Sequence, residues 1–185
     1  MNRQYKCLNN QIIFLNNTKI VPIRDEDKFL ILKWRNEQIY HLRQEKLITK
    51  EEQIIYFDNV VNKLFSKLEP DQILFSFLIN NKCVGYGGLV HISWINMTAE
   101  VSFIMDTNLE SKYFQKYWVN FLKLIESIAF NQLNFNKLYT YAFDLRPNLY
   151  KILEFSGYIY SSTLKNQFFK DSKLIDVVIH HKINN

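Results

Sequence analysis

One carboxylate, Glu100, lies within the apolar stretch "AEVSFIM" (Ala99–Met105), whose alternating pattern predicts a β-strand. An unpaired carboxylate is costly to bury in such surroundings, and burial raises the pKa of a carboxyl group toward neutrality. Glu100 is therefore a candidate general base. Two other interpretations stay open: the side chain faces solvent, or it pairs with a lysine. His91, on the preceding predicted strand, can face the same cleft or have a purely structural role.

A second candidate is the corner "NLESKYFQKYW" (Asn108–Trp118), where a predicted strand gives way to a predicted helix. A helix start leaves backbone N–H groups unpaired and carries partial positive charge, so it attracts phosphate. Glycines often let the ligand approach at such corners, but this one has none. We expect an anion near Ser111–Phe114, with added attraction from Lys112 and Lys116. The alternatives are a weak or shifted site, and aromatic packing without a ligand.

A third group of polar side chains lies in "WRNEQIYHLRQ" (Trp34–Gln44), at the end of a predicted helix. Arg35 and Arg43 suit a ligand that carries phosphate or carboxylate. Tyr40 can stack on a sugar or a base. The alternative is an ordinary helix end with one buried tryptophan and solvated arginines.

The sequence suggests no metal site. His180 and His181 are adjacent, so on a strand they face opposite ways, and no carboxylate spacing accompanies them. The glycines of "VGYGGLV" lie inside a predicted hairpin strand, which indicates a bulge or a close ligand approach rather than a nucleotide loop.

Composition predicts one globular domain over residues 1–185, with a core over about residues 11–182. The net charge of +5 is spread along the chain without a run of like charges, so we expect no nucleic-acid partner. The two cysteines, Cys7 and Cys83, form no CxxC motif and are expected to be reduced thiols. A polar start and the absence of any long apolar run predict a cytoplasmic protein without a membrane span.

The first half of the chain carries clear start, stop and turn signals. Asn16-Asn17 and Asn80-Asn81 are pairs that suit tight hairpin turns. Thr49 and Glu52 have the spacing of a helix capping box. The expected elements are a strand or short hairpin, two helices and a long hairpin, over residues 11–24, 25–38, 49–70 and 72–92.

The second half continues with a strand, a helix, a strand and a helix, and it ends in two strands joined at Asp171-Ser172. Pro147 and Gly157 mark the start and stop of the last helix. A strand–helix–strand unit should form a right-handed parallel crossover. The expected ranges are 98–105, 112–133, 137–143, 146–157 and 158–182. The order predicts a mixed α/β fold: a mostly antiparallel central sheet with one parallel strand pair, flanked by helices.

This order resembles that of the GNAT N-acetyltransferases, and three stretches add to the likeness over about residues 20–182. "IRDEDKFLILKWRNE" resembles the opening of a branch that contains ribosomal-protein-alanine and amino-sugar N-acetyltransferases. "TAEVSFIM" is similar to the central strand of that branch, with Glu100 at its glutamate. "SIAFNQLNFNKLYTYAFDLRPNLYKILEFSGY" is similar to its closing part, which ends in Gly157-Tyr158.

The resemblance implies an acetyl-CoA site and roles for particular residues. The family cradles the CoA diphosphate with Arg/Gln-x-x-Gly-x-Gly/Ala; the matching stretch here is Tyr113–Trp118, in which every glycine is replaced by a bulky residue. The family tyrosine that protonates the thiolate corresponds to Leu153, so Tyr150 is the nearby substitute, with packing as the alternative. The implied cofactor-binding residues are Ser102, Phe103, Ile104, Lys112, Tyr113, Phe114, Lys116, Arg146 and Asn148.

The resemblance also implies an acceptor site built by the first two helices and the final hairpin. Its expected residues are Trp34, Arg35, Asn36, Tyr40, His41, Arg43 and His91. The implied function is acetyl transfer from acetyl-CoA to the primary amine of a small-molecule acceptor, such as a nucleotide-linked amino sugar. A protein N-terminus as acceptor is one alternative, and a non-catalytic binding module of the same fold is the other. The aromatic content suggests a homodimer.

Overall fold

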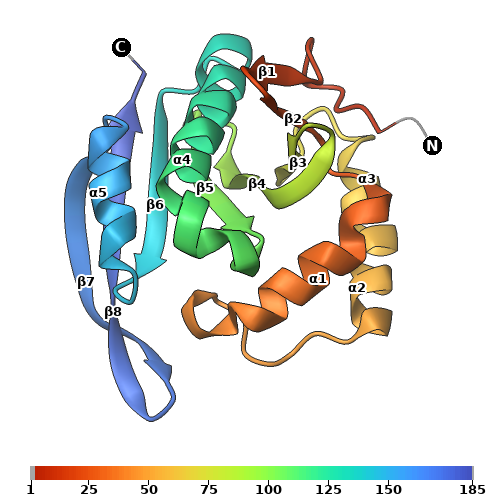
Figure 1. Ribbon diagram of the computed structural model, residues 1–185. Helices are drawn as coiled ribbons and strands as arrows, with labels where there is room; N and C mark the ends of the chain where they lie inside the picture. Colours follow the sequence, from red (N-terminus) through yellow and green to blue (C-terminus); the bar gives the residue numbers. More distant parts are fainter. Residues whose placement is uncertain (1–2, 185) are drawn as a thin grey trace.

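A computed structural model describes residues 3–184, which form one eight-stranded sheet flanked by helices (Figure 1). The strands lie in the order β1-β2-β3-β4-β5-β6-β8-β7, and every neighbouring pair is antiparallel except β5 with β6. This confirms the predicted fold class. The strand bounds are β1 Ile13–Leu15, β2 Thr18–Pro22, β3 Ile73–Ile79, β4 Lys82–Ser93, β5 Thr98–Met105, β6 Lys137–Phe143, β7 Ile159–Lys170 and β8 Lys173–Ile183.

The predicted hairpin turns are confirmed. Asn80 and Asn81 both have positive φ, 48° and 66°, between β3 and β4, as a two-residue turn with the twist of the flanking strands requires. Asp171 and Ser172 have φ of 47° and 62° between β7 and β8. Asn16, with φ of 55°, turns β1 into β2. Asparagine and aspartate tolerate this region better than most residues, so local sequence alone fixed these turns.

The helices in the first half of the chain begin near their expected limits. Their bounds are η1 Asp25–Asp27, α1 Lys28–Glu37, η2 Ile39–His41, α2 Lys50–Tyr56, η3 Phe57–Val61 and α3 Asn62–Leu64. The Thr49 hydroxyl accepts the Glu52 N–H, and the Glu52 side chain accepts the Thr49 N–H, which confirms the capping box. The π-helical turn η3 continues α2 into α3, so the expected second helix is one rod that ends earlier than predicted.

The helix after β5 starts earlier than the sequence pattern indicated. It is α4, Thr107–Glu126, followed by the π turn η4, Ser127–Gln132, and it begins two residues after β5 ends. The Asp106 side chain accepts the N–H of Asn108 and caps this start. The predicted start at Lys112 is wrong, because Asn108–Lys112 contains no helix breaker and continues the helix from that cap. The last helix is α5, Pro147–Phe155, with Pro147 in its first turn and Gly157 at φ 85° just beyond it.

The parallel strands β5 and β6 are paired over only three residues, Thr98–Glu100 with Lys137–Tyr139. Beyond them β5 stays on β4 as far as Met105, while β6 stays on β8 as far as Phe143. The facing edges of the two strands therefore part, and each leads into a helix, α4 or α5 (Figure 1). This separation creates a hollow between the two strands.

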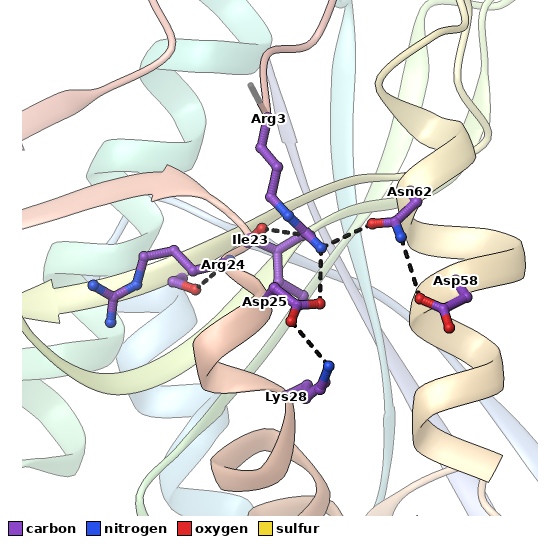
Figure 2. A network of polar contacts seen from close by, with 8 residues as sticks. Arg3, Ile23, Arg24, Asp25, Lys28, Asp58 and Asn62 are labelled. Atoms are coloured by element: carbon purple, nitrogen blue, oxygen red, sulfur yellow. Dashed lines mark hydrogen bonds and ion pairs between the residues drawn. The ribbon is translucent and has the colours of Figure 1, made fainter. Parts of the chain in front are cut away.

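The N-terminal segment contacts both the sheet and the first helices. The ring of Tyr5 is buried, and its hydroxyl donates to the carbonyl oxygen of Leu74 and accepts the N–H of the same residue. Arg3 donates to the Ile23 carbonyl oxygen and to the side chains of Asp25 and Asn62, at 2.9, 3.1 and 2.8 Å (Figure 2). One arginine thus ties the start of η1 to the beginning of α3, which steadies the helical pair α1–α2.

The glycines of β4 serve packing rather than ligand approach. A Cβ atom on Gly87 would lie 2.1 Å from the Ser102 carbonyl oxygen and 2.9 Å from the ring of Phe121 on α4. The close ligand approach expected from the sequence is not found at Gly87, because β5 and α4 occupy that space. No helix within residues 3–184 is both long and apolar enough to cross a membrane.

Candidate active site

The hollow between the parting strands is a cleft of about 430 Å³. Its walls come from β5 and β6, its floor includes Trp118 of α4, and the segment after α1 covers one side. The side chains with polar or charged groups that line it include Arg35, His41, Arg43, Tyr56, Asp71, Gln72, His91, Glu100, Ser102, Thr140, Tyr141 and Arg146. The cleft remains open beside Trp118, so the bulky residues of α4 do not fill it.

Glu100 lies at the inner end of the cleft, in the last paired position before β5 leaves β6. Only 5% of its side chain is exposed. Burial raises the pKa of Glu100 to about 7, although the neighbouring Arg43 opposes this rise. A carboxyl group with a pKa near 7 can take a proton at physiological pH and release it again. The solvent-facing interpretation of Glu100 is thus excluded.

Arg43 is the ion-pair partner of Glu100, through its Nη2 and the Oε1 of the carboxylate. Its guanidinium also lies 4.7 Å from the ring centre of Tyr141. His91 approaches the other carboxylate oxygen at 3.9 Å. It stands where β4 bulges between Val90 and Ser93, with φ of 47°, and bulges commonly redirect side chains at functional sites. Burial and Arg43 both lower the pKa of His91, which favours the neutral imidazole.

The outer end of the cleft, beyond the carboxyl ends of β5 and β6, contains a second ion pair. Arg146, the N-cap residue of α5, donates to Glu110 of α4 at 2.6 Å. It also donates to Nε2 of His41 at 2.8 Å, and its guanidinium lies 4.7 Å from the ring centre of Phe114. Burial and Arg146 lower the pKa of His41 to about 3, so this imidazole is neutral and can accept the arginine N–H.

The described residues are better suited to bind the pantetheine arm of CoA than to form a backbone cradle for its diphosphate. The facing edges of β5 after Glu100 and of β6 after Tyr139 have no strand partner within residues 3–184, so their backbone groups can pair with the amides of a pantetheine chain. The backbone of Ser111–Phe114 lies past the first turn of α4, where N–H groups bond within the helix. The expectation of unpaired backbone N–H groups at this place is therefore wrong. The charged group that the cleft presents to a diphosphate is Arg146.

Eight of the residues expected from the sequence line this cleft. They are Arg35, His41, Arg43, His91, Glu100, Ser102, Phe103 and Arg146. They come from the segment around α1 and η2, from β4 and β5, and from the start of α5, and the parting of β5 from β6 brings them together.

The other expected residues lie outside the lining. Trp34 and Ile104 belong to the core. Asn36 bonds both the N–H and the carbonyl oxygen of Ile48, so it shapes the loop after α1. Tyr40 is exposed, with its ring edge-on to His41. The remaining residues are exposed or half-buried on α4 and α5: Lys112, Tyr113, Phe114, Lys116 and Asn148.

Tyr150 points away from the cleft. Its hydroxyl donates to Asp144 at 3.0 Å, and its ring stacks on His180. Burial and the Asp144 carboxylate raise its pKa, so it holds its proton more firmly than an ordinary tyrosine. Leu153, the position that corresponds to the family acid, lies one helical turn further along α5 and is fully buried. The expectation that Tyr150 replaces the family acid has no support in this position.

Sequence reasoning missed the β6 wall of the cleft, Thr140–Phe143, and the pair Tyr56 and Gln72. A signal for the wall was present: a parallel crossover was predicted, and the second strand of such a pair must face the first. The contribution of Tyr56 had no such signal, since it depends on how the rod formed by α2, η3 and α3 packs. Among residues 3–184, no three His, Cys, Asp or Glu side chains are placed to hold a metal ion.

Comparison with known proteins gives the family. The profile of the acetyltransferase (GNAT) domain matches residues 20–179. The structure of spermidine N-acetyltransferase from Vibrio cholerae in complex with CoA and spermine is similar, with a TM-score of 0.78 and 16% identity over 92% of this chain and 97% of that chain.

A dodecameric structure of the spermidine N-acetyltransferase from the same organism, in an intermediate state, has a TM-score of 0.76 and 16% identity, over 92% of this chain and 95% of that chain. At this identity the likenesses show the fold. No curated protein sequence matches this chain significantly.

The family match covers most of the chain, and its fold carries the cleft, the buried carboxylate and the free strand edges described above. The chain belongs to the GNAT acetyltransferase family and is an acyltransferase with acetyl-CoA as its acyl donor.

Proposed function

We propose that this enzyme acetylates the primary amine of a small acceptor that also carries an anionic group, such as a nucleotide-linked amino sugar. The observation that carries the proposal is the charge of the cleft around Glu100. Its two carboxylates are both already paired, Glu100 with Arg43 and Asp71 with Lys67. Arg35 also lines it and has no carboxylate partner among residues 3–184. Such a lining favours an acceptor with phosphate or carboxylate.

Glu100 is the proposed general base. Acetyl-CoA supplies the acetyl group as a thioester, and the acceptor amine must lose a proton as its nitrogen bonds to the acetyl carbon and the sulfur leaves. The carboxylate of Glu100, with a pKa of about 7, takes that proton directly or through a water molecule. The unpaired amides on the cleft edge of β5 can stabilise the negative charge that develops on the acetyl oxygen.

Arg35 is held in place for ligand binding rather than free in solvent. It donates to the Tyr86 hydroxyl at 2.8 Å and to the Gln44 side chain at 3.1 Å. The pKa of Arg35 is raised mainly by Tyr86, so its charge is permanent. A fixed, charged guanidinium is suited to bidentate contact with an anionic acceptor group.

A polyamine acceptor is the competing possibility, since the similar structure from Vibrio cholerae is described with spermine. A polycation would need carboxylates that are free to bind it, and both carboxylates of the described lining are already paired. The amino-sugar branch of the family is therefore the proposed placement. Acetylation of a protein N-terminus stays an alternative without a specific contact in its favour.

The test is a matched set of acceptors assayed by release of free CoA thiol. Glucosamine 6-phosphate and glucosamine differ only in the phosphate, and spermidine provides the polycation. We expect kcat/KM for the phosphorylated sugar to exceed that for the plain sugar by about tenfold or more, as one charge-assisted contact allows. Equal values for the two sugars, or a preference for spermidine, would contradict the proposal.

Assembly is a separate prediction. A homodimer was expected from the aromatic content of the chain, and it stays a prediction; one similar structure is described as dodecameric. Light scattering on the purified protein measures the oligomeric state directly.

A further inference from the structure

At the outer end of the cleft, two lining residues, His41 and Arg146, form a cluster with two side chains of α4 that lie outside the lining. Glu110 and Phe114 project from adjacent turns of α4, Arg146 comes from the start of α5, and His41 ends η2. Only 12% of the Arg146 side chain and 21% of the Glu110 side chain are exposed. The cluster lies between the first turns of the two helices that follow the parting strands.

Arg146 is the cation of this cluster, and its buried environment favours an anionic partner. Its guanidinium is largely removed from water, where an unpaired cation is costly. Phe114 supports one face of it, His41 accepts one N–H, and Glu110 supplies the only carboxylate with which it pairs among residues 3–184. Because His41 is neutral, replacing Glu110 by another anion would leave the rest of the cluster unchanged.

The helix amides at this end are not available to a diphosphate. Helix α4 starts at Thr107, so the residues that replace the family glycines, Tyr113–Trp118, lie within its bonded part. Lys112 and Lys116 are exposed and do not line the cleft. The bulky Phe114 has a different use: it is the platform on which Arg146 rests.

We propose that Arg146 is the anchor for the CoA diphosphate, and that the diphosphate binds by displacing Glu110 from it. Glu110 then acts as an internal competitor that keeps the arginine in place while the cleft is empty. The proposal rests on the acyl donor of the family and not on the identity of the acceptor. It explains how a chain without the glycine cradle can bind the same donor.

The test is the dissociation constant for CoA, measured by titration calorimetry without any acceptor. Arg146→Gln should raise it by about tenfold or more, because a charge-assisted phosphate contact is lost. Glu110→Gln should lower it about threefold to tenfold, because the competitor is removed while the cation stays. Arg146→Lys should be intermediate, since lysine keeps the charge without the planar fork.

Two controls separate an anchor from a structural residue. Lys112→Gln removes an exposed charge from the same helix, and we expect the dissociation constant to change by less than about twofold. Pantetheine, which has no phosphate, should shift the melting temperature of Arg146→Gln as much as that of the parent protein.

An unchanged affinity for CoA in Arg146→Gln would overturn the proposal. So would weaker CoA binding in Glu110→Gln, or a loss of the pantetheine shift in Arg146→Gln, since either result makes the ion pair structural. If Arg146→Gln does not fold, the sign of the Glu110→Gln effect decides, because tighter binding requires that Glu110 competes with the ligand.

Discussion

The two ends of the cleft each hold one pair of a carboxylate and an arginine, but a different partner is buried. At the inner end Glu100 is 5% exposed while Arg43 is 35% exposed. At the outer end Arg146 is 12% exposed, less than Glu110 at 21%. In the inner pair the carboxylate is far more buried than the arginine, whereas in the outer pair both partners are largely buried and the arginine slightly more so.

This difference teaches what each pair can do. A deeply buried carboxylate whose partner is partly exposed resists ionisation, and its pKa moves into the range of a general base. A buried guanidinium cannot lose its charge, so it can only exchange one anion for another. Proton transfer is thus favoured at the inner end and anion binding at the outer end. Four predictions test this contrast, beginning with the largest expected effect.

Glu100→Gln should lower kcat by about a hundredfold to ten-thousandfold, the range associated with the loss of a general base. Its melting temperature should remain close to that of the parent, because Arg43 keeps contact with solvent and with Tyr141. Steady-state kinetics and calorimetry provide the two measurements. Asp71→Asn is the matched control, a carboxylate at the same cleft that pairs with Lys67. An equal loss of activity in the control would remove the special role of Glu100.

The rate should depend on pH through the same group. Below a pKa of about 7 for Glu100, kcat/KM should fall about tenfold per pH unit, and above it the rate should level off. The stability of the fold should change with pH in the opposite direction to the rate. Because folding raises this pKa above its ordinary value of 4.5, the stabilisation from protonated Glu100 is complete below pH 4.5 and is lost as the pH rises through 7.

Glu100→Gln provides the control for both curves. The variant should show no acidic limb in any residual rate, and its stability should lack the decline between pH 4.5 and 7 that is assigned to this group. An acidic limb that persists with the same midpoint would assign the titration to another residue.

Arg43→Gln should have a smaller effect and should sharpen the contrast. Arg43 lowers the pKa of Glu100 against the effect of burial, so its removal should move the acidic limb of kcat/KM to higher pH. Above that limb we expect kcat to change by less than about tenfold, since the carboxylate itself remains. Arg43→Lys should keep the limb near its original place. A limb that does not move would mean that the ion pair has no influence on the base.

Tyr150→Phe should have the smallest effect, less than about threefold on kcat. The hydroxyl is bonded to Asp144 and lies outside both ends of the cleft. Turnover assays and a melting curve are sufficient, with Tyr40→Phe as a second exposed hydroxyl for comparison. A loss of a hundredfold or more would restore Tyr150 as the proton donor to the leaving sulfur and would show that the helix turns during catalysis.

Much of the fold could be predicted because its signals are local. Asparagine pairs set the hairpins, Thr49 and Glu52 set one helix start, and Pro147 with Gly157 bounds another. The start of α4 was missed for a local reason as well. Asp106 is a good N-cap residue and caps α4, but the apolar helical period is clear only from the aromatic residues further along.

The candidate site was harder to predict than the fold. Glu100 could be identified from the sequence because burying a carboxylate in an apolar strand is energetically costly, so such a residue is unusual. Arg146 was expected among the cofactor-binding residues, but its partners were not predicted, because Glu110 is 36 residues away and His41 is 105 residues away. Tyr150 was favoured by sequence position alone, which carries no information on the direction of its side chain.

The sequence by itself determined the order of strands and helices, the parallel crossover and the identity of the buried acid. These depend on neighbours within a few residues, where backbone preference and hydrophobic period act. Only the tertiary structure decided where β5 leaves β6, which arginine meets which carboxylate, and which partner of each pair is shielded from water. Those outcomes depend on how α4, α5 and the segment after α1 pack against the sheet, and burial then sets whether each pair can move a proton or hold an anion.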